Sequence, residues 1–176
     1  MSCYAALHPN ARETDLFTLY PERPEDWWEV EALYDTCFAP GRTALSSYRL
    51  REDVLPVSGL CVVARDEAGI LGAAIRYWPV LVGGAEVLLL GPIAVHPTAQ
   101  GEGLGSSLII DTLERASEAG HDRVLLVGDA PYYRRFGFKP LQGVIMPPPT
   151  NPERVLGASL TPQAWAGIKG TVERKA

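Results

Sequence analysis

The most constraining feature of this sequence is an uninterrupted apolar run at residues 87–90 (VLLL), within a segment that extends to Val95. Apolar residues at consecutive positions indicate a strand covered on both faces, so this strand belongs in the middle of a sheet. An amphipathic helix over 105–119 and a short apolar strand over 123–127 follow it. Such a strand, helix, strand unit requires parallel pairing with a right-handed crossover. We therefore expect helices on both faces of the sheet.

Two further strands are expected to precede this middle strand, and the three form an antiparallel series of hairpins. Residues 60–65 are joined by a turn to 70–82, and the pair Gly83-Gly84 then provides a two-residue hairpin turn to 85–95. The expected fold class is therefore α/β (α+β), with a mixed, mostly antiparallel central sheet. The other early elements are a strand over 16–20, a helix over 24–38 that Pro40 and Gly41 end, and a short helix over 43–51.

Length and composition favour one ordinary globular domain. The chain has 176 residues, 47% of them hydrophobic and 21% charged, which suits a single core of about 16–146 with a C-terminal extension over 147–176. A formal net charge of -5 provides no general attraction for nucleic acid or anionic lipid, so neither a nucleic acid nor a membrane partner is expected.

Cysteine spacing and terminal composition predict a cytoplasmic protein. Cys3, Cys37 and Cys61 are odd in number and widely spaced, so they are expected to be reduced, buried thiols rather than disulfides or metal ligands. The N-terminus lacks the pattern of a secretory signal, and the most apolar stretch, 80–95, is too short and too interrupted to span a bilayer.

Three alternating glycines, Gly101, Gly103 and Gly105, stand where the helix begins. They leave N–H groups unobstructed, and a helix N-terminus attracts phosphate through unpaired donors and its dipole. This loop is therefore a candidate pyrophosphate site. It does not fit the Rossmann G-x-G-x-x-G spacing, because Ser106 or Leu108 replaces the third glycine, and it lacks the Gly-Lys-Ser/Thr of a P-loop. A dinucleotide oxidoreductase or a nucleoside triphosphatase is disfavoured.

Two motifs follow one another along the chain. The first is Q-x-x-G-x-G, formed by Gln100, Gly103 and Gly105 after a strand that ends in Val-His-Pro. The second, Y-x-x-F-G-F, runs from Tyr133 to Phe138. Together they resemble the GNAT superfamily of N-acetyltransferases, and the likeness covers about 16–138 in order of elements. The extension is similar to that of the bacterial YhbS-like group in this superfamily.

The resemblance implies a coenzyme A site and an acetyl-CoA-dependent reaction. The pyrophosphate would lie on the glycine loop, the pantetheine arm would pair with 93–95, and an N–H near Val95 or Ile93 would lie at the acetyl oxygen. Tyr133 would protonate the departing thiolate. The implied coenzyme-binding residues are Ile93, Ala94, Val95, Gln100, Gly101, Glu102, Gly103, Leu104, Gly105, Ser106, Tyr132 and Arg135.

A break in the middle strand is expected at Gly91-Pro92. Because proline cannot donate to a strand ladder, a bulge should loosen the pairing there and splay the neighbouring strands. The general base has three candidates, each with an ordinary structural alternative. Glu86 suits a solvated strand end and His96 a satisfied loop histidine, whereas Asp129 either acts as the base or caps the next helix.

Acceptor recognition is expected from the first two helices, because the family builds that side of the cleft from this region. The candidates are Phe38, Arg42, Tyr48 and Arg49, although both arginines would also suit a solvated surface. The expected activity is acetyl transfer to a primary amine of a small molecule, protein or peptide by direct attack in a ternary complex. The alternative is an acyl-CoA-binding sensor without turnover.

The extension itself allows three interpretations. It contains a strand candidate over 154–160 and a helix start at Thr161-Pro162-Gln163. It is expected to complete a sheet edge; the alternatives are that it covers the acceptor cleft or pairs with a second subunit in a homodimer.

Overall fold

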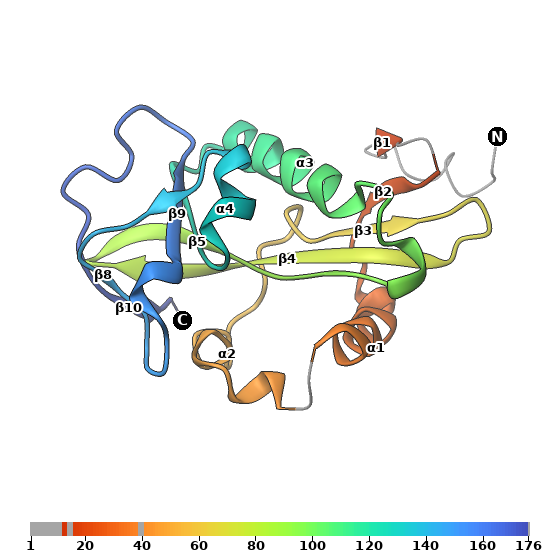
Figure 1. Ribbon diagram of the computed structural model, residues 1–176, viewed down its shortest axis with the longest axis horizontal. Coiled ribbons are helices and arrows are strands. Elements are labelled where there is room, and N and C mark those ends of the chain that lie inside the picture. Colours follow the sequence, from red (N-terminus) through yellow and green to blue (C-terminus); the bar gives the residue numbers. More distant parts are fainter. Residues whose placement is uncertain (1–11, 14–15, 39–40, 176) are drawn as a thin grey trace.

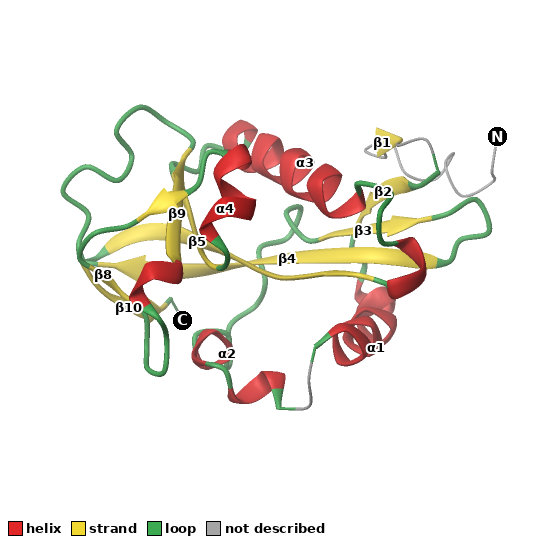
Figure 2. Cartoon of the chain, viewed as in Figure 1, coloured by secondary structure: helices red, strands yellow, loops and turns green. Residues whose placement is uncertain are grey.

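The computed structural model describes residues 12–13, 16–38 and 41–175, so the predictions for Cys3 and Pro40 lie outside the described residues. Figure 1 shows a long twisted sheet with α3 and α4 on one face and α1 and α2 on the other, and Figure 2 distinguishes the helices, in red, from the strands, in yellow. The expected fold class is confirmed. The helices are α1 (Trp27–Cys37), α2 (Ser46–Arg49), α3 (Leu104–Glu118) and α4 (Ala130–Tyr133), with 3-10 turns at Pro24–Asp26, Arg42–Ala44, Pro97–Ala99, Arg134–Phe136 and Pro152–Arg154.

The sheet is mixed, as predicted, and its strands run in the order β1-β2-β3-β4-β5-β6-β9-β7. Pairing is antiparallel along this order except between β5 and β6, which are parallel. The strands are β1 (Arg12–Glu13), β2 (Thr18–Pro21), β3 (Val62–Arg65), β4 (Leu71–Val82), β5 (Ala85–Val95), β6 (Arg123–Val127), β7 (Lys139–Pro140), β8 (Val144–Ile145), β9 (Val155–Ser159) and β10 (Gly170–Arg174).

Successive side chains along the central strands point to opposite faces of the sheet and so pack against both helical layers. On β4, Ile75 and Tyr77 pack beneath α3 with Leu108 and Ile109, and the Tyr77 hydroxyl hydrogen-bonds to Thr112 Oγ1 at 2.8 Å. Residues one position along β4 face the opposite layer, where Ala74 packs with Val30 and Tyr34 of α1. Burial on both faces explains why the middle strand is apolar at consecutive positions.

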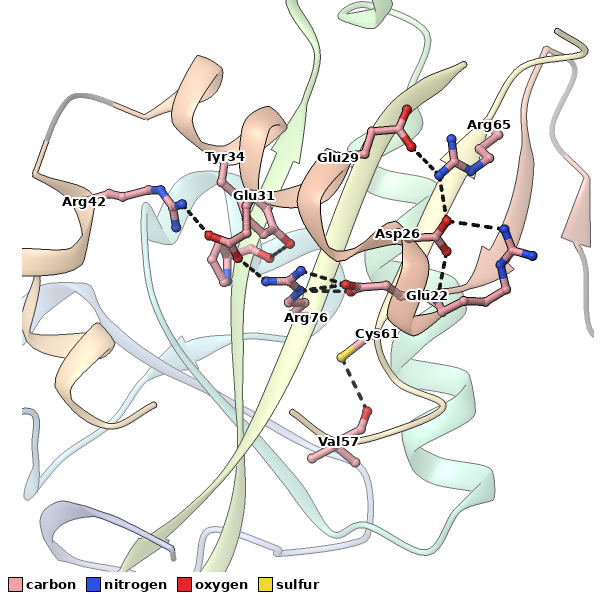
Figure 3. A network of polar contacts seen from close by, with 12 residues as sticks. Glu22, Asp26, Glu29, Glu31, Tyr34, Arg42, Val57, Cys61, Arg65 and Arg76 are labelled. Carbon is pink, nitrogen blue, oxygen red and sulfur yellow. Dashed lines mark hydrogen bonds and ion pairs between the residues drawn. The ribbon is translucent and has the colours of Figure 1, made fainter. Parts of the chain in front are cut away.

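Ion pairs attach α1 to the sheet (Figure 3). Arg76 of β4 is 1% exposed, and its guanidinium donates to Glu22 at 2.7 Å and to Glu31 of α1 at 2.5 Å. The same Glu31 accepts from Arg42 at 2.6 Å, so the chain that leaves α1 is tied to the helix as well. A second group joins Arg65 of β3 to Asp26 at 3.0 Å. These contacts fix one wall of the site described below.

The C-terminal extension completes the sheet, as expected. β9 lies antiparallel to β6, and β10 pairs antiparallel with the distal end of β4. The predicted helix start at Thr161 is wrong, because residues 162–167 form turns. Gln163 and Gly167 have φ of 57° and 73°, in the left-handed region that a right-handed helix cannot include.

Candidate active site

The predicted break in β5 is present, and it opens the sheet. Ile75 pairs with Ile93 and Tyr77 pairs with Leu90, so Gly91 and Pro92 together oppose Arg76 in a bulge. On the other side, β5 pairs with β6 at Leu88–Val124 and Leu89–Leu125, whereas both strands continue beyond these pairs. The two parallel strands therefore diverge into a fork just where the bulge lies.

The exposed edge of this fork offers backbone donors. The His96 N–H donates to Gly72 O of β4 at 2.8 Å. Alternation therefore directs the Ala94 N–H toward β4 and the N–H groups of Ile93 and Val95 toward the fork. The Ala94 side chain is buried against α1, which removes it from the fork. Of the three predicted pantetheine-pairing residues, Ile93 and Val95 thus present their N–H groups in the required direction.

The glycine loop forms the entrance of α3. Gly101 and Gly103 have φ of 90° and 71°, a conformation that glycine adopts without a Cβ clash. The Ser107 N–H donates to Gly103 O at 3.0 Å, so the N–H groups before it have no upstream helical carbonyl and point out of the helix end. Leu104 anchors this end in the core at 2% exposure, while Glu102 is exposed and Ser106 is partly exposed.

Two of the predicted coenzyme-binding residues contact the loop or the strand before it. Gln100 Nε2 donates to Val95 O at 3.4 Å, which ties the loop back to the end of β5. The Tyr132 hydroxyl lies beside Gly105, 3.6 Å from the position that a Cβ there would occupy. The Arg135 guanidinium lies over the Tyr132 ring, 4.3 Å from its centroid. The predicted coenzyme residues of the loop and of the second motif therefore lie together.

A cavity of about 370 Å³ lies at the fork and is lined from both faces of the sheet. Leu90 and Ile93 of β5 and Leu126 of β6 form its sides. Tyr133 reaches it from the layer of α3, and Tyr48 reaches it from the layer of α2. The opening therefore connects the two faces, so a ligand on the loop and a second ligand from the α2 side would meet in it.

Tyr133 enters this cavity at the end of α4. Burial is the main reason that its pKa is raised, and the charges of Tyr132 and Asp129 raise the pKa further while Arg154 lowers it. The phenol is therefore protonated at neutral pH. The Tyr133 ring can occupy this place because residue 128 is glycine; a Cβ at 128 would lie 2.4 Å from Tyr133 Cε2.

The three candidate bases lie in different surroundings. Asp129 is exposed, lines the cavity, and occupies the N-cap position of α4 without a side-chain capping hydrogen bond. His96 instead accepts from the Thr98 N–H at 3.3 Å and caps a 3-10 turn, and Glu86 is an exposed strand residue that contacts Lys175. Asp129 is thus the candidate that lines the cavity, and the ordinary interpretations of His96 and Glu86 are confirmed.

The predicted acceptor residues separate into two groups. Phe38, Arg42 and Tyr48 line the cavity, whereas Arg49 is exposed and does not contribute to its lining. Arg42 is not a solvated surface arginine, because it is 9% exposed and pairs with Glu31 at 2.6 Å and with Asp35 at 2.8 Å. Its charge is therefore balanced within the chain.

Two lining arginines, Arg51 and Arg154, were not among the predicted site residues. Arg51 follows Tyr48 by three positions, a spacing that puts both on one side of a helical turn and that was a usable signal in the sequence. Arg154 comes from the extension and donates to Gly128 O at 3.3 Å. Its position depends on the pairing of β9 with β6, for which the sequence carried no local signal.

Comparisons with known proteins identify the family. The model of the acetyltransferase (GNAT) domain matches residues 58–140. The Escherichia coli K12 N-acetyltransferase YhbS is 33% identical over 120 residues, which make up 67% of this chain and 71% of that protein.

Two crystal structures extend the likeness over nearly the whole chain. That of Escherichia coli YhbS in complex with CoA has a TM-score of 0.79 and 27% identity, and covers 93% of this chain and 94% of that chain. That of a GNAT family acetyltransferase from Brucella melitensis in complex with acetyl-CoA has a TM-score of 0.69 and 30% identity, and covers 91% and 96%. The chain with this forked sheet and glycine loop therefore belongs to the GNAT family of N-acetyltransferases.

Proposed function

We propose that this chain transfers an acetyl group from acetyl-CoA to a primary amine of a small molecule or peptide, by direct attack in a ternary complex. The observation that carries the proposal is the cavity through the β5–β6 fork, with Tyr133 and Asp129 on its wall. The relatives crystallised with CoA and acetyl-CoA support the choice of donor. A cytoplasmic location and a homodimer stay predictions from the sequence.

The residues along the fork fit a coenzyme A ligand. The left-handed glycines of the loop and the first turn of α3 present N–H donors of the kind that bind a diphosphate. From there to the cavity, the edge of β5 provides the N–H groups of Ile93 and Val95 for an extended amide-bearing arm. Gln100, Tyr132 and Arg135 flank this path. The donor would thus lie on the α3 side, with its thioester at the fork.

The same residues suit the chemistry of acetyl transfer. Acetyl-CoA supplies a thioester whose carbonyl oxygen gains negative charge during attack and whose sulfur leaves as a thiolate. The N–H of Ile93, which lines the cavity, would stabilise the charge on that oxygen. The Tyr133 hydroxyl would donate its proton to the sulfur, and its raised pKa keeps it protonated until that moment.

Asp129 supports the remaining proton transfer. An alkylammonium acceptor has a pKa of about 10 and must lose a proton before it attacks. Asp129 lines the cavity just after the end of β6, and its carboxylate would accept that proton directly or through water.

Coenzyme release with an amine panel tests the proposal. We expect acetyl-CoA to raise the melting temperature of the protein, ATP and NAD to leave it unchanged, and CoA to be released with at least one amine. Tyr133→Phe should lower kcat by about 100-fold, the usual contribution of a general acid, with little change in KM for acetyl-CoA. An unchanged kcat would remove Tyr133 from this role. Binding without release across the panel would favour the sensor alternative.

A further inference from the structure

Arg51 is a partly buried cation that forms no ion pair with a carboxylate of the described residues. Its Nε and Nη1 atoms are buried and have no hydrogen-bond partner in the described part of the chain. The guanidinium lies over the Tyr48 ring at 4.4 Å and near the Trp78 ring at 5.7 Å. Aromatic faces compensate part of the lost hydration of a cation, but less than a paired carboxylate does. Arg51 is therefore only partly satisfied in this state.

The other buried arginines differ from Arg51. The guanidinium of Arg42 pairs with Glu31 and Asp35, that of Arg65 with Asp26 and Glu29, and that of Arg76 with Glu22 and Glu31, each through a contact of 3.0 Å or less. Burial lowers the pKa of Arg51 to about 10. Each of these three arginines thus has a carboxylate counter-ion within the chain, whereas Arg51 has none among the described residues.

Arg51 lies where two cavities meet. It lines the cavity of the fork and also a second cavity of about 300 Å³ on the α1 and α2 side of the sheet, and both cavities share Arg42, Tyr48 and Pro92. Trp27 and Trp78 form aromatic walls in the second cavity. An anion in either cavity would reach Arg51, on the opposite face of the sheet from the glycine loop. This position is on the acceptor side and not on the coenzyme side.

We propose that the acceptor amine carries a carboxylate that pairs with Arg51, so that the substrate class is amino acids and similar small amines. This inference rests on the function proposed above. A carboxylate suits the site better than a phosphate, because Arg51 is a single unbalanced cation and Glu31, Glu52 and Asp129 line the same cavities. The amine would then lie toward Tyr133 and Asp129, with the side chain of the acceptor against the aromatic walls.

The test compares free amino acids with their carboxamides as acceptors. Each of the twenty L-amino acids is assayed for CoA release beside its carboxamide, which keeps the amine and the side chain but lacks the charge. We expect at least one acid to exceed its carboxamide by about ten-fold to a hundred-fold in kcat/KM, the range of a hydrogen bond to a charged group. In Arg51→Met this ratio should fall to near one. Arg49→Met, which removes an exposed arginine, should retain the ratio.

Three further measurements separate failure of this inference from failure of the proposed function. The shift in melting temperature caused by CoA should be equal in wild type and Arg51→Met. If CoA does not shift the melting temperature of the wild-type protein, the proposed function itself is rejected. Without ligand, Arg51→Met should lose little stability, because it breaks no ion pair and loses only the contacts of the guanidinium with Tyr48 and Trp78. If CoA binds but no acceptor is acetylated, calorimetric titration of the amino acids into the CoA complex shows whether any of them binds. A carboxamide equal to its acid, failure of every acid to bind, or a large loss of stability in Arg51→Met would each overturn the assignment.

Discussion

Gly128 leaves room for the aromatic ring of Tyr133 in the site. A Cβ at position 128 would lie 2.4 Å from Cε2 and 2.9 Å from Cδ2 of Tyr133, and the backbone at 128 does not itself need glycine. Gly128→Ala should therefore displace the Tyr133 ring from the cavity. We expect kcat to fall by at least ten-fold, since a shift of about 1 Å in a catalytic group costs up to a hundred-fold. Steady-state kinetics with saturating acetyl-CoA measures this change in kcat.

A double variant shows whether Gly128 acts through the tyrosine. In Tyr133→Phe the proton donor is already absent, so adding Gly128→Ala should cause little further loss of kcat. Multiplicative losses would mean that Gly128 has a separate role, for example in holding Arg154, whose Nε donates to Gly128 O.

At this scale the sequence predicted residues whose role is local and missed those placed by distant contacts. Gln100, Gly103 and Tyr133 belong to short motifs, and each lies as expected beside the loop or the fork. Arg49 is a predicted acceptor residue, but α2 ends at Arg49, and the next turn directs Arg51 over the Tyr48 ring. The three-residue spacing from Tyr48 to Arg51 is the sequence signal for this position, whereas the contact of Arg51 with Trp78 joins segments distant in sequence.

At the scale of elements, α1 forms its wall of the site because Arg76 holds it to β4. Arg76→Met would leave Glu22, with a side chain 7% exposed, and Glu31 without this partner. Removing one member of a buried ion pair costs about 3 to 5 kcal/mol, because the other charge stays buried. We expect a loss of about 3 kcal/mol in the free energy of unfolding, measured by urea denaturation.

A surface ion pair provides the control. Lys175 contacts Glu86 in an exposed pair, so Lys175→Met should leave the urea midpoint unchanged. Equal effects of both substitutions would contradict the anchoring role of Arg76.

Elements were predictable where their neighbours in the sheet are also neighbours in sequence. The hairpins of β3, β4 and β5 and the crossover through α3 follow from turns and periodicity. The position of β9 in the sheet does not follow from such signals, because 27 residues separate β9 from its partner β6. Which strand β9 pairs with depends on which edge of the sheet remains uncovered. The turns after β9 resemble a helix start in the sequence, yet left-handed residues within them prevent helix formation.

For the whole molecule, buried tyrosine phenols and a buried cysteine thiol predict a loss of stability at alkaline pH. Burial raises the pKa of Tyr34, Tyr77 and Tyr133 above the usual value, and raises the pKa of the Cys61 thiol to about 11. Below pH 8 these groups are protonated in both states, so stability is at its full value. Above about pH 8.5 for the thiol and 10 for the phenols, the unfolded chain releases protons that the native chain retains. The native state is then increasingly disfavoured as pH rises.

The size of this effect is measurable by urea denaturation between pH 7 and 11. Each such group lowers the free energy of unfolding by up to about 1.4 kcal/mol per pH unit once its unfolded form ionises. Arg51 opposes the trend, because its pKa is lowered to about 10 and the native chain releases that proton first. Four groups against one predict a net decline, steepest above pH 10. Tyr77→Phe, which removes one phenol and its bond to Thr112, should be less stable at pH 7 but should decline less steeply. A urea midpoint that is flat to pH 11 would show that these side chains ionise as freely in the native protein as in the unfolded chain.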